Sequence, residues 1–152
     1  FIINRPTTNN NQEMASLSAE VRDMKKMMML SLLENPSASE RIRGVSYTSE
    51  IKSGNKEVIE ALLTTLNSDP NVNVRLVTLE ALTQYADDAA VRTGLVQSIV
   101  EQDSPIMQAA LADVMLKLKD KRSVKSFRKL LQQKDLDHSI RNKIEQTITG
   151  LI

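Results

Sequence analysis

Apolar residues recur in this chain at a fixed interval of 33 residues, and this register constrains the fold more than any other feature. Four columns repeat with that spacing: Val58, Val91 and Val124; Val74, Met107 and Ile140; Leu82, Met115 and Ile148; Tyr85, Leu118 and Leu151. A unit of this length cannot bury its apolar face alone, so neighbouring units must stack into a continuous core. The register therefore predicts an array of repeats, an architecture that more often binds partners than catalyses reactions.

Good N-cap residues stand directly before proline at three regularly spaced points, Asn35-Pro36, Asp69-Pro70 and Ser104-Pro105. Proline suits the first position of a helix, so each pair predicts a helix start. At the first of them, Ser37 with Glu40 offers an alternative capping box. Each start is followed by apolar periodicity, a polar break and a second helix. The expected helices span 37–52 and 56–67, 71–85 and 88–102, 105–118 and 121–133, and 138–151.

These elements predict an all-α fold over residues 35–152, in which about three helical hairpins and a closing helix stack as an α–α superhelix. No stretch shows the strict alternation of apolar and polar residues, bounded by turns, that a β-hairpin requires, so strand content should be negligible. Residues 1–11 contain Pro6 and three consecutive Asn and lack apolar periodicity. We expect them to form a flexible linker.

Residues 12–34 are expected to form an amphipathic stalk helix ahead of the repeat domain. Its apolar residues follow one another at alternating steps of three and four from Met14 onward, which is the seam of an amphipathic helix. The seam spans fewer than three heptads, which is short for a coiled coil. Four of its residues are candidates for self-association into a homo-oligomer: Leu17, Val21, Met24 and Met28. We expect Met27–Met29 to pack between the stalk and the first hairpin rather than to form an adaptable binding surface.

The repeats carry short motifs at matching offsets: in the second repeat these are Asp69-Pro70, Val74-Arg75, Ala81-Leu82 and Asp87. This pattern resembles a HEAT repeat of the short bacterial type, and the resemblance covers residues 35–152. The third repeat has Gln108 where Arg75 stands, and the fourth regains arginine at Arg141. The Thr-Pro-Leu-His motif of ankyrin repeats and the Trp of tetratricopeptide repeats are both missing from the sequence.

The junction of stalk and repeats, residues 27–45, is similar to the join found in certain bacterial membrane proteins. In that family, a zinc-finger segment like that of anti-sigma factors precedes one transmembrane helix, a helical stalk and a HEAT-repeat domain. The resemblance implies a membrane-tethered domain facing the periplasm or, alternatively, the cytoplasm. The chain begins at Phe1 rather than Met, so we expect it to be part of a longer protein. It has no Cys ligands and no membrane span, so no functional residue is carried over.

No catalytic, cofactor or metal site is predicted from the residues. The chain has no Cys and one histidine, His138, which would need Asp135 and Asp137 to hold a metal ion. An Asp-rich linker ahead of a helix more often caps that helix. We likewise expect Asp87 and Asp88 to act on a helix dipole. The four Gly form no phosphate-binding loop, so the sequence predicts a non-enzymatic protein with no small-molecule substrate.

Charge is balanced overall but not along the chain. Residues 35–103 contain ten acidic and six basic side chains, net −4, whereas residues 104–152 contain five acidic and ten basic side chains, net +5. On the expected helix 121–133, Val124, Phe127 and Leu131 should face the core. The opposite side is the candidate partner-binding surface: Lys125, Arg128, Lys129 and Gln132. The HEAT resemblance implies that second helices line a concave binding face; the alternative is a charged face that only keeps the protein soluble.

These features predict a protein–protein interaction scaffold with an unidentified protein partner. One alternative is a sensory or regulatory domain of a membrane-anchored anti-sigma-type transcription regulator. Another is nucleic-acid binding through the basic C-terminal face. The acidic first half and the scarcity of aromatic residues disfavour nucleic acid, because unpaired bases are bound by stacking on aromatic side chains. Charges interrupt every long apolar stretch, so we expect membrane attachment only through an anchor upstream of this segment.

Overall fold

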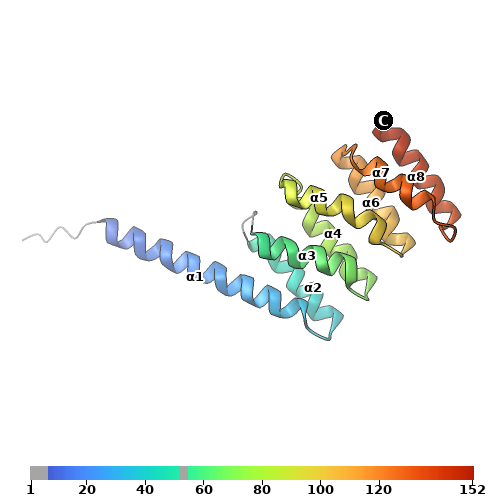
Figure 1. The fold of residues 1–152 in the computed structure, drawn as a ribbon. Helices are drawn as coiled ribbons and strands as arrows, with labels where there is room; N and C mark the ends of the chain where they lie inside the picture. Colours follow the sequence, from blue (N-terminus) through green and yellow to red (C-terminus); the bar gives the residue numbers. More distant parts are fainter. Residues whose placement is uncertain (1–6, 52–54) are drawn as a thin grey trace, which may run out of the picture.

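The computed structural model describes residues 7–51 and 55–152, and every regular element in them is a helix (Figure 1). The predicted all-α class is confirmed. In chain order the helices are α1 (Thr7–Leu33), α2 (Ala38–Ser46), the 3₁₀ helix η1 (Tyr47–Glu50), α3 (Lys56–Ser68), α4 (Val72–Gln84), α5 (Ala89–Ser98), the 3₁₀ helix η2 (Ile99–Glu101), α6 (Pro105–Leu118), α7 (Ser123–Leu131) and α8 (His138–Leu151).

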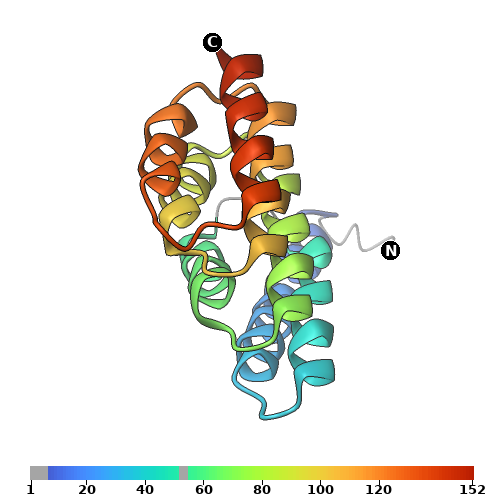
Figure 2. The same cartoon turned by 90° about the vertical axis from the view of Figure 1, so that its right-hand side faces the viewer.

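The helices form two layers, which Figure 2 shows as two neighbouring columns. One layer contains α1, α3, α5 and α7, each packed against the next, and the other contains α2, α4, α6 and α8. Across the layers, α1 packs on α2, α3 on α4 and α7 on α8. Equivalent helices of successive repeats therefore lie next to each other, as the 33-residue register predicts. The winding of this stack into a superhelix stays a prediction.

The 33-residue register is a register of buried side chains. All nine members of its first three columns are buried. In the fourth column Leu151 is buried, whereas Tyr85 and Leu118 are half-buried. The single O–H of Tyr85 is shared between two acceptors, the carbonyl oxygens of Thr48 and, at 3.1 Å, Ile51, which ties the end of α4 to η1. Burial raises the pKa of this tyrosine above its usual value.

Helix starts follow the predicted pattern with small shifts. Helix α6 begins at Pro105, directly after its N-cap Ser104, as predicted. Helix α2 begins at Ala38 after its N-cap Ser37, which is the alternative cap, although the Ser37 side chain makes no capping hydrogen bond. Helix α4 begins at Val72, two residues after Pro70, so the predicted caps at Asn35 and Asp69 are wrong. The cap of α4 is Asn71, whose side chain accepts a hydrogen bond from the backbone N–H of Asn73 at 2.9 Å. The expected helices 37–52 and 88–102 each change to a 3₁₀ turn near their ends, η1 and η2.

Instead of capping α4, the Asp69 side chain binds an arginine of the preceding repeat. This is the first of a series of polar contacts between repeats. Arg41 on α2 donates from Nε and Nη2 to the two carboxylate oxygens of Asp69, at 2.7 and 3.0 Å. One repeat later, Arg75 Nη1 lies 3.3 Å from Asp103 Oδ1. Where the third repeat has Gln108, the amide donates to a backbone carbonyl in the preceding loop at 2.9 Å. These contacts hold the start of one helix to the loop beside it.

Helix α1 differs from the predicted stalk at both ends. It begins at Thr7, so residues 7–11 are helical rather than linker, and residues 1–6 lie outside the described residues. No Pro or Gly interrupts the chain from Thr7 to Leu33, and a proline is tolerated just before a helix, which accounts for the longer helix. At the other end, Met29 is fully buried against α2 and its neighbours. The last turns of α1 are therefore part of the two-layer stack.

Candidate functional site

The four side chains predicted to bind a partner lie together on the solvent side of α7. Val124, Phe127 and Leu130 are buried beneath them. Leu131, which was predicted to face the core, is only half-buried, because the buried positions of this short helix follow at steps of three. The exposed set is called the basic surface from here on: Lys125, Arg128, Lys129 and Gln132.

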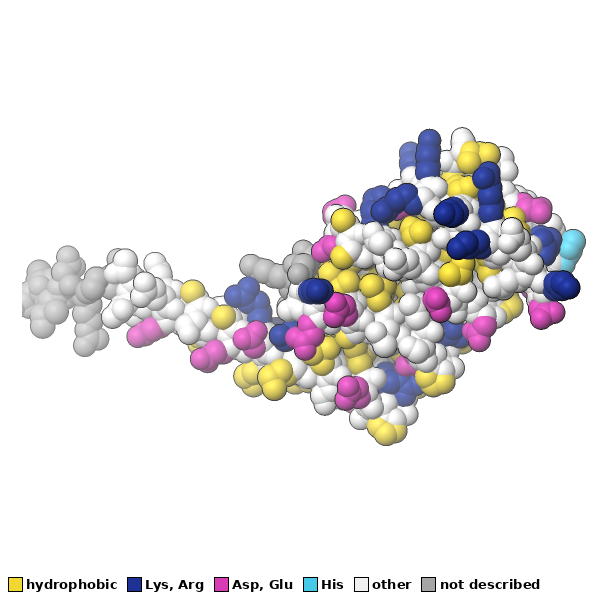
Figure 3. All heavy atoms as spheres, in the orientation of Figure 1, with side chains coloured by type: hydrophobic (Ala, Val, Ile, Leu, Met, Phe, Trp, Pro, Cys, Tyr) yellow, Lys and Arg dark blue, Asp and Glu magenta, His cyan; other side chains and the backbone are white. Residues whose placement is uncertain are grey.

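The positive charges of the basic surface are uncompensated. Within the part of the chain that the structure describes, no ion pair or side-chain hydrogen bond engages Lys125, Arg128 or Lys129. By contrast, the acidic Glu57 and Glu60 of α3, in the same layer, each lie within ion-pair distance of a lysine. Figure 3 shows Lys and Arg side chains gathered over the C-terminal end of the array, with acidic side chains more frequent over the earlier helices. Along this layer, the acidic residues of α3 are paired with lysines, whereas the basic residues of α7 have no acidic partner among the described residues.

A tight turn before α7 fixes the position of the basic surface. Lys119 ends α6 in the left-handed conformation, with φ of 52°, and turns the chain sharply. The buried carboxylate of Asp120 then accepts the backbone N–H of Arg122 at 3.1 Å and its Nη2 at 2.7 Å. These hydrogen bonds from Arg122 hold the pKa of Asp120 below its usual value. The hydroxyl of Ser123 donates to the Asp120 carbonyl at 2.6 Å, which completes the start of α7.

The predicted self-association residues form an exposed stripe along α1. Leu17, Val21, Met24 and Met28 are all exposed, as is Met14. These five residues are called the α1 stripe. Of the three consecutive methionines that were expected to pack between the stalk and the first hairpin, only Met29 does so. Met27 and Met28 are exposed because they lie on other sides of the helix.

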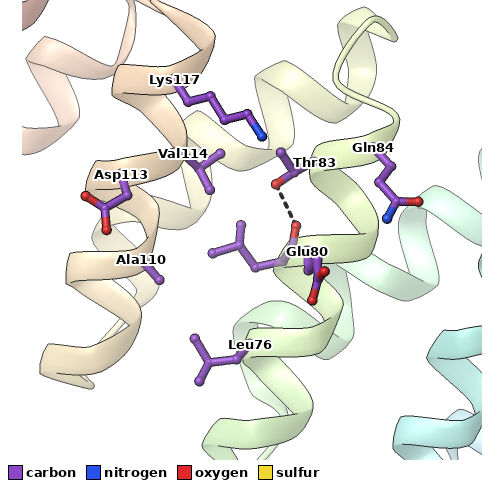
Figure 4. A pocket seen from close by; sticks show the side chains of 9 residues that line it. Leu76, Glu80, Thr83, Gln84, Ala110, Asp113, Val114 and Lys117 are labelled. Carbon is purple, nitrogen blue, oxygen red and sulfur yellow. Dashed lines mark hydrogen bonds between the residues drawn. The ribbon is translucent and has the colours of Figure 1, made fainter.

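Sequence reasoning missed an apolar groove between α4 and α6, which Figure 4 shows from close by. The groove has a volume of about 490 Å³. Its apolar lining comes from Leu76, Leu79, Ala110 and Val114, and its polar lining from Glu80, Thr83, Gln84, Asp113 and Lys117. The small side chain of Ala110 is the one sequence signal that could have indicated it. Thr83 is already engaged, donating to the Leu79 carbonyl at 2.7 Å, and Asp113 pairs with Lys143 at 2.8 Å.

Two aspartates outside these surfaces cap helices. Asp88 and Asp137 cap α5 and α8, each accepting backbone N–H groups. Hydrogen bonds from Ser139 and the helix start hold the pKa of Asp137 below its usual value. His138 is the exposed first residue of α8. Across residues 7–51 and 55–152, no group of three or more His, Asp or Glu side chains is placed to hold a metal ion.

No protein-family model matches this chain, and no curated protein is significantly similar to it in sequence. Among the helices that the structure describes, none combines the length and the apolar character needed to cross a membrane.

Proposed function

We propose that this chain is a non-enzymatic protein-binding module whose basic surface on α7 binds an acidic surface of a partner protein. The observation that carries the proposal is the set of three exposed and uncompensated positive charges at Lys125, Arg128 and Lys129. Complementary charge across an interface mainly raises the association rate and selects the partner. A rigid helix that presents such charges at fixed spacing is suited to that role.

The packing of α7 supports this function. Phe127 and Leu130 have no exposed surface, so the helix carrying the basic surface is anchored in the core. Basic residues in the last turn of a helix also interact favourably with the helix dipole. Arg128 and Lys129 lie in the last turn of α7, so they can stabilise the helix as well as bind a partner. A dipole role alone accounts for charges in the last turn only. Lys125 lies in the first turn of α7, where the dipole disfavours a positive charge, so the dipole does not account for it.

Two further features are part of this proposal: a HEAT-type architecture, and a role as a domain of a membrane-anchored regulator. The two-layer stacking of equivalent helices and the arginine contacts at Arg41 and Arg75 support a HEAT-like scaffold. If the chain is a regulatory domain, the basic surface would be its output site. Nucleic acid is the competing ligand for the same charges. It predicts an affinity that falls linearly in a log–log plot against salt with a steep slope.

A charge-reversal experiment tests the proposal. The variant Arg128→Glu/Lys129→Glu and the control Arg22→Glu/Lys56→Glu undergo the same change in net charge at exposed helical positions. Pull-downs from the source cell, quantified by mass spectrometry, should lose the partners with the α7 variant and retain them with the control. Both variants should melt close to the wild-type temperature. Identical partner sets for wild type and the α7 variant would show that this surface is not the binding site, and nuclease-sensitive capture would indicate nucleic acid instead.

A further inference from the structure

The first two-thirds of α1 extends away from the array without packing on it (Figure 1). From residue 8 to residue 24, every side chain is exposed except that of Ala19, which is half-buried. The helix begins with Thr and Asn residues of low helix propensity and has no acidic residue in its first turn. In proteins, most of the stability of a helix comes from packing of its amphipathic face. The extension lacks such packing within one copy of the chain.

The α1 stripe is the side of the extension that exposes apolar side chains to water. Its residues, Met14, Leu17, Val21, Met24 and Met28, occupy alternating a and d positions of a heptad pattern. Met24 is 67% exposed, so most of its side chain lies in solvent. The equally exposed Met27, at 68%, lies about a quarter turn away from the stripe. The stripe is thus a defined seam rather than an apolar coating of the whole helix.

We propose that the α1 stripe is covered by the same stripe of a second copy of this chain, as a short parallel two-stranded coiled coil. The charges beside the seam favour this occupant and this direction. Glu20 occupies a g position and Lys25 the following e position. In a parallel pair, each Glu20 faces Lys25 of the second copy, giving two attractive contacts. In an antiparallel pair with the stripes in register, Glu20 faces Glu20 of the second copy, which is repulsive.

The array leaves the seam accessible for this pairing. The array-facing side of α1 is marked by Met29 and by two ion pairs, Lys25 Nζ to Glu50 Oε2 at 2.7 Å and Lys26 Nζ to Glu57 Oε2 at 3.1 Å. This side lies about a quarter turn from the stripe. The Lys25 side chain is 37% exposed at the edge between the two, so its ammonium can meet a second carboxylate. A two-fold axis along the paired helices would place the two arrays on opposite sides.

Sedimentation velocity of the whole chain over a concentration series tests the pairing. Wild type should show a monomer–dimer equilibrium, because a seam of fewer than three heptads gives weak association. Met24→Lys should shift its midpoint to at least about ten-fold higher concentration, which corresponds to about 1.4 kcal/mol. The control Ala15→Lys adds the same charge at an exposed b position on the far side of the helix, so it should behave like wild type. A monomeric wild type, or equal effects of the two substitutions, would overturn the proposal.

Cysteine cross-linking tests the direction, because the chain has no Cys of its own. In the parallel dimer, two copies of Leu17→Cys bring their thiols together, so this single variant should form disulfide-linked dimers under mild oxidation. In the antiparallel dimer that sets Glu20 against Glu20, a positions face d positions, so Leu17 lies near Val21 of the second copy. Cross-linking only in a mixture of Leu17→Cys and Val21→Cys would therefore refute the parallel arrangement. This pairing does not involve α7, so its failure leaves the proposed function of the basic surface standing.

Discussion

At the scale of single residues, the same sequence motif has different roles in successive repeats because its burial differs. Arg41–Asp69 and Arg75–Asp103 occupy equivalent positions. The Asp69 side chain is 5% exposed and accepts two hydrogen bonds from its arginine, whereas the Asp103 side chain is 91% exposed and accepts one. Both arginine side chains are mostly buried, at 12% and 11% exposed, so the two contacts differ at the carboxylate. The exposed Asp103 carboxylate is solvated by water and its ion pair contributes little, whereas removing the buried Asp69 carboxylate takes two hydrogen bonds from Arg41.

This difference predicts unequal effects of two equivalent substitutions. Asp69→Ala should lower the melting temperature clearly, because Arg41 then loses its bidentate partner between α2 and α3. Asp103→Ala should leave it nearly unchanged. Thermal unfolding followed by circular dichroism measures both. Equal shifts for the two variants would show that the position in the repeat, rather than burial, determines the contribution.

Asp120 predicts a pH dependence of stability. Its pKa is lowered in the folded protein by the hydrogen bonds from Arg122, so its contribution is fully present above the unfolded value of about 3.9. That contribution is lost as the pH falls from there through the lower folded value. The stability advantage of wild type over Asp120→Asn should therefore shrink on acidification below about pH 4. Urea unfolding at several pH values measures it, with the exposed Asp87→Asn as control; a constant difference would contradict the mechanism.

At the scale of elements, the contact between α1 and α2 depends on a close backbone approach at Gly44. A Cβ atom there would lie 2.8 Å from Leu32 Cβ, and 3.2 Å from both Leu33 N and Met29 O. These are atoms of the backbone or next to it, which cannot move without shifting a helix. Gly150 on α8 differs, since a Cβ there would meet only the flexible end of Leu116 at 2.9 Å.

Gly44→Ala should therefore destabilise the protein by about 1–3 kcal/mol through overpacking, despite the better helix propensity of alanine. Gly150→Ala should be neutral or stabilising by up to about 1 kcal/mol. Chemical denaturation of both variants tests the comparison. If Gly44→Ala proves as stable as wild type, α1 and α2 do not approach as closely as described.

At the scale of the whole molecule, α1 has two parts with different dependence on the array. Residues up to Met24 extend from the stack, whereas Met29 is buried in it. Because Met29 fills the core beside α2, the boundary between extension and array lies within α1 rather than at its end. Any experiment that removes the extension must cut there to leave the stack intact.

Truncation should reveal this boundary. Removing residues 1–24 should change the melting temperature of the array little, because those residues pack on nothing in it. Removing residues 1–34 should lower it strongly, since the shorter chain uncovers apolar surface around Val45. Calorimetry of both truncations measures the difference. Comparable melting temperatures would show that the last turns of α1 are dispensable.

The sequence by itself determined the helical class, the stacking of repeats and the helix order. The reason is that the period of apolar residues is a local property, and 33-residue columns such as Val74, Met107 and Ile140 can be buried together only if equivalent helices adjoin. The exposed side of α7 was predictable for the same reason. The start of α1 was not, because helix propensity in the run of Asn residues is weak and nothing in the sequence breaks the helix after Pro6.

Only the tertiary structure decided which surfaces are free and which residues join elements. The close approach at Gly44, the burial of Met29, the pairing of Asp69 with Arg41 and the groove beside Ala110 all depend on distances between helices. Those distances result from the packing of whole side chains across two layers, which no local period encodes. The sequence therefore contained the candidate residues, and the packing of the array separated those that stay exposed from those that hold the fold.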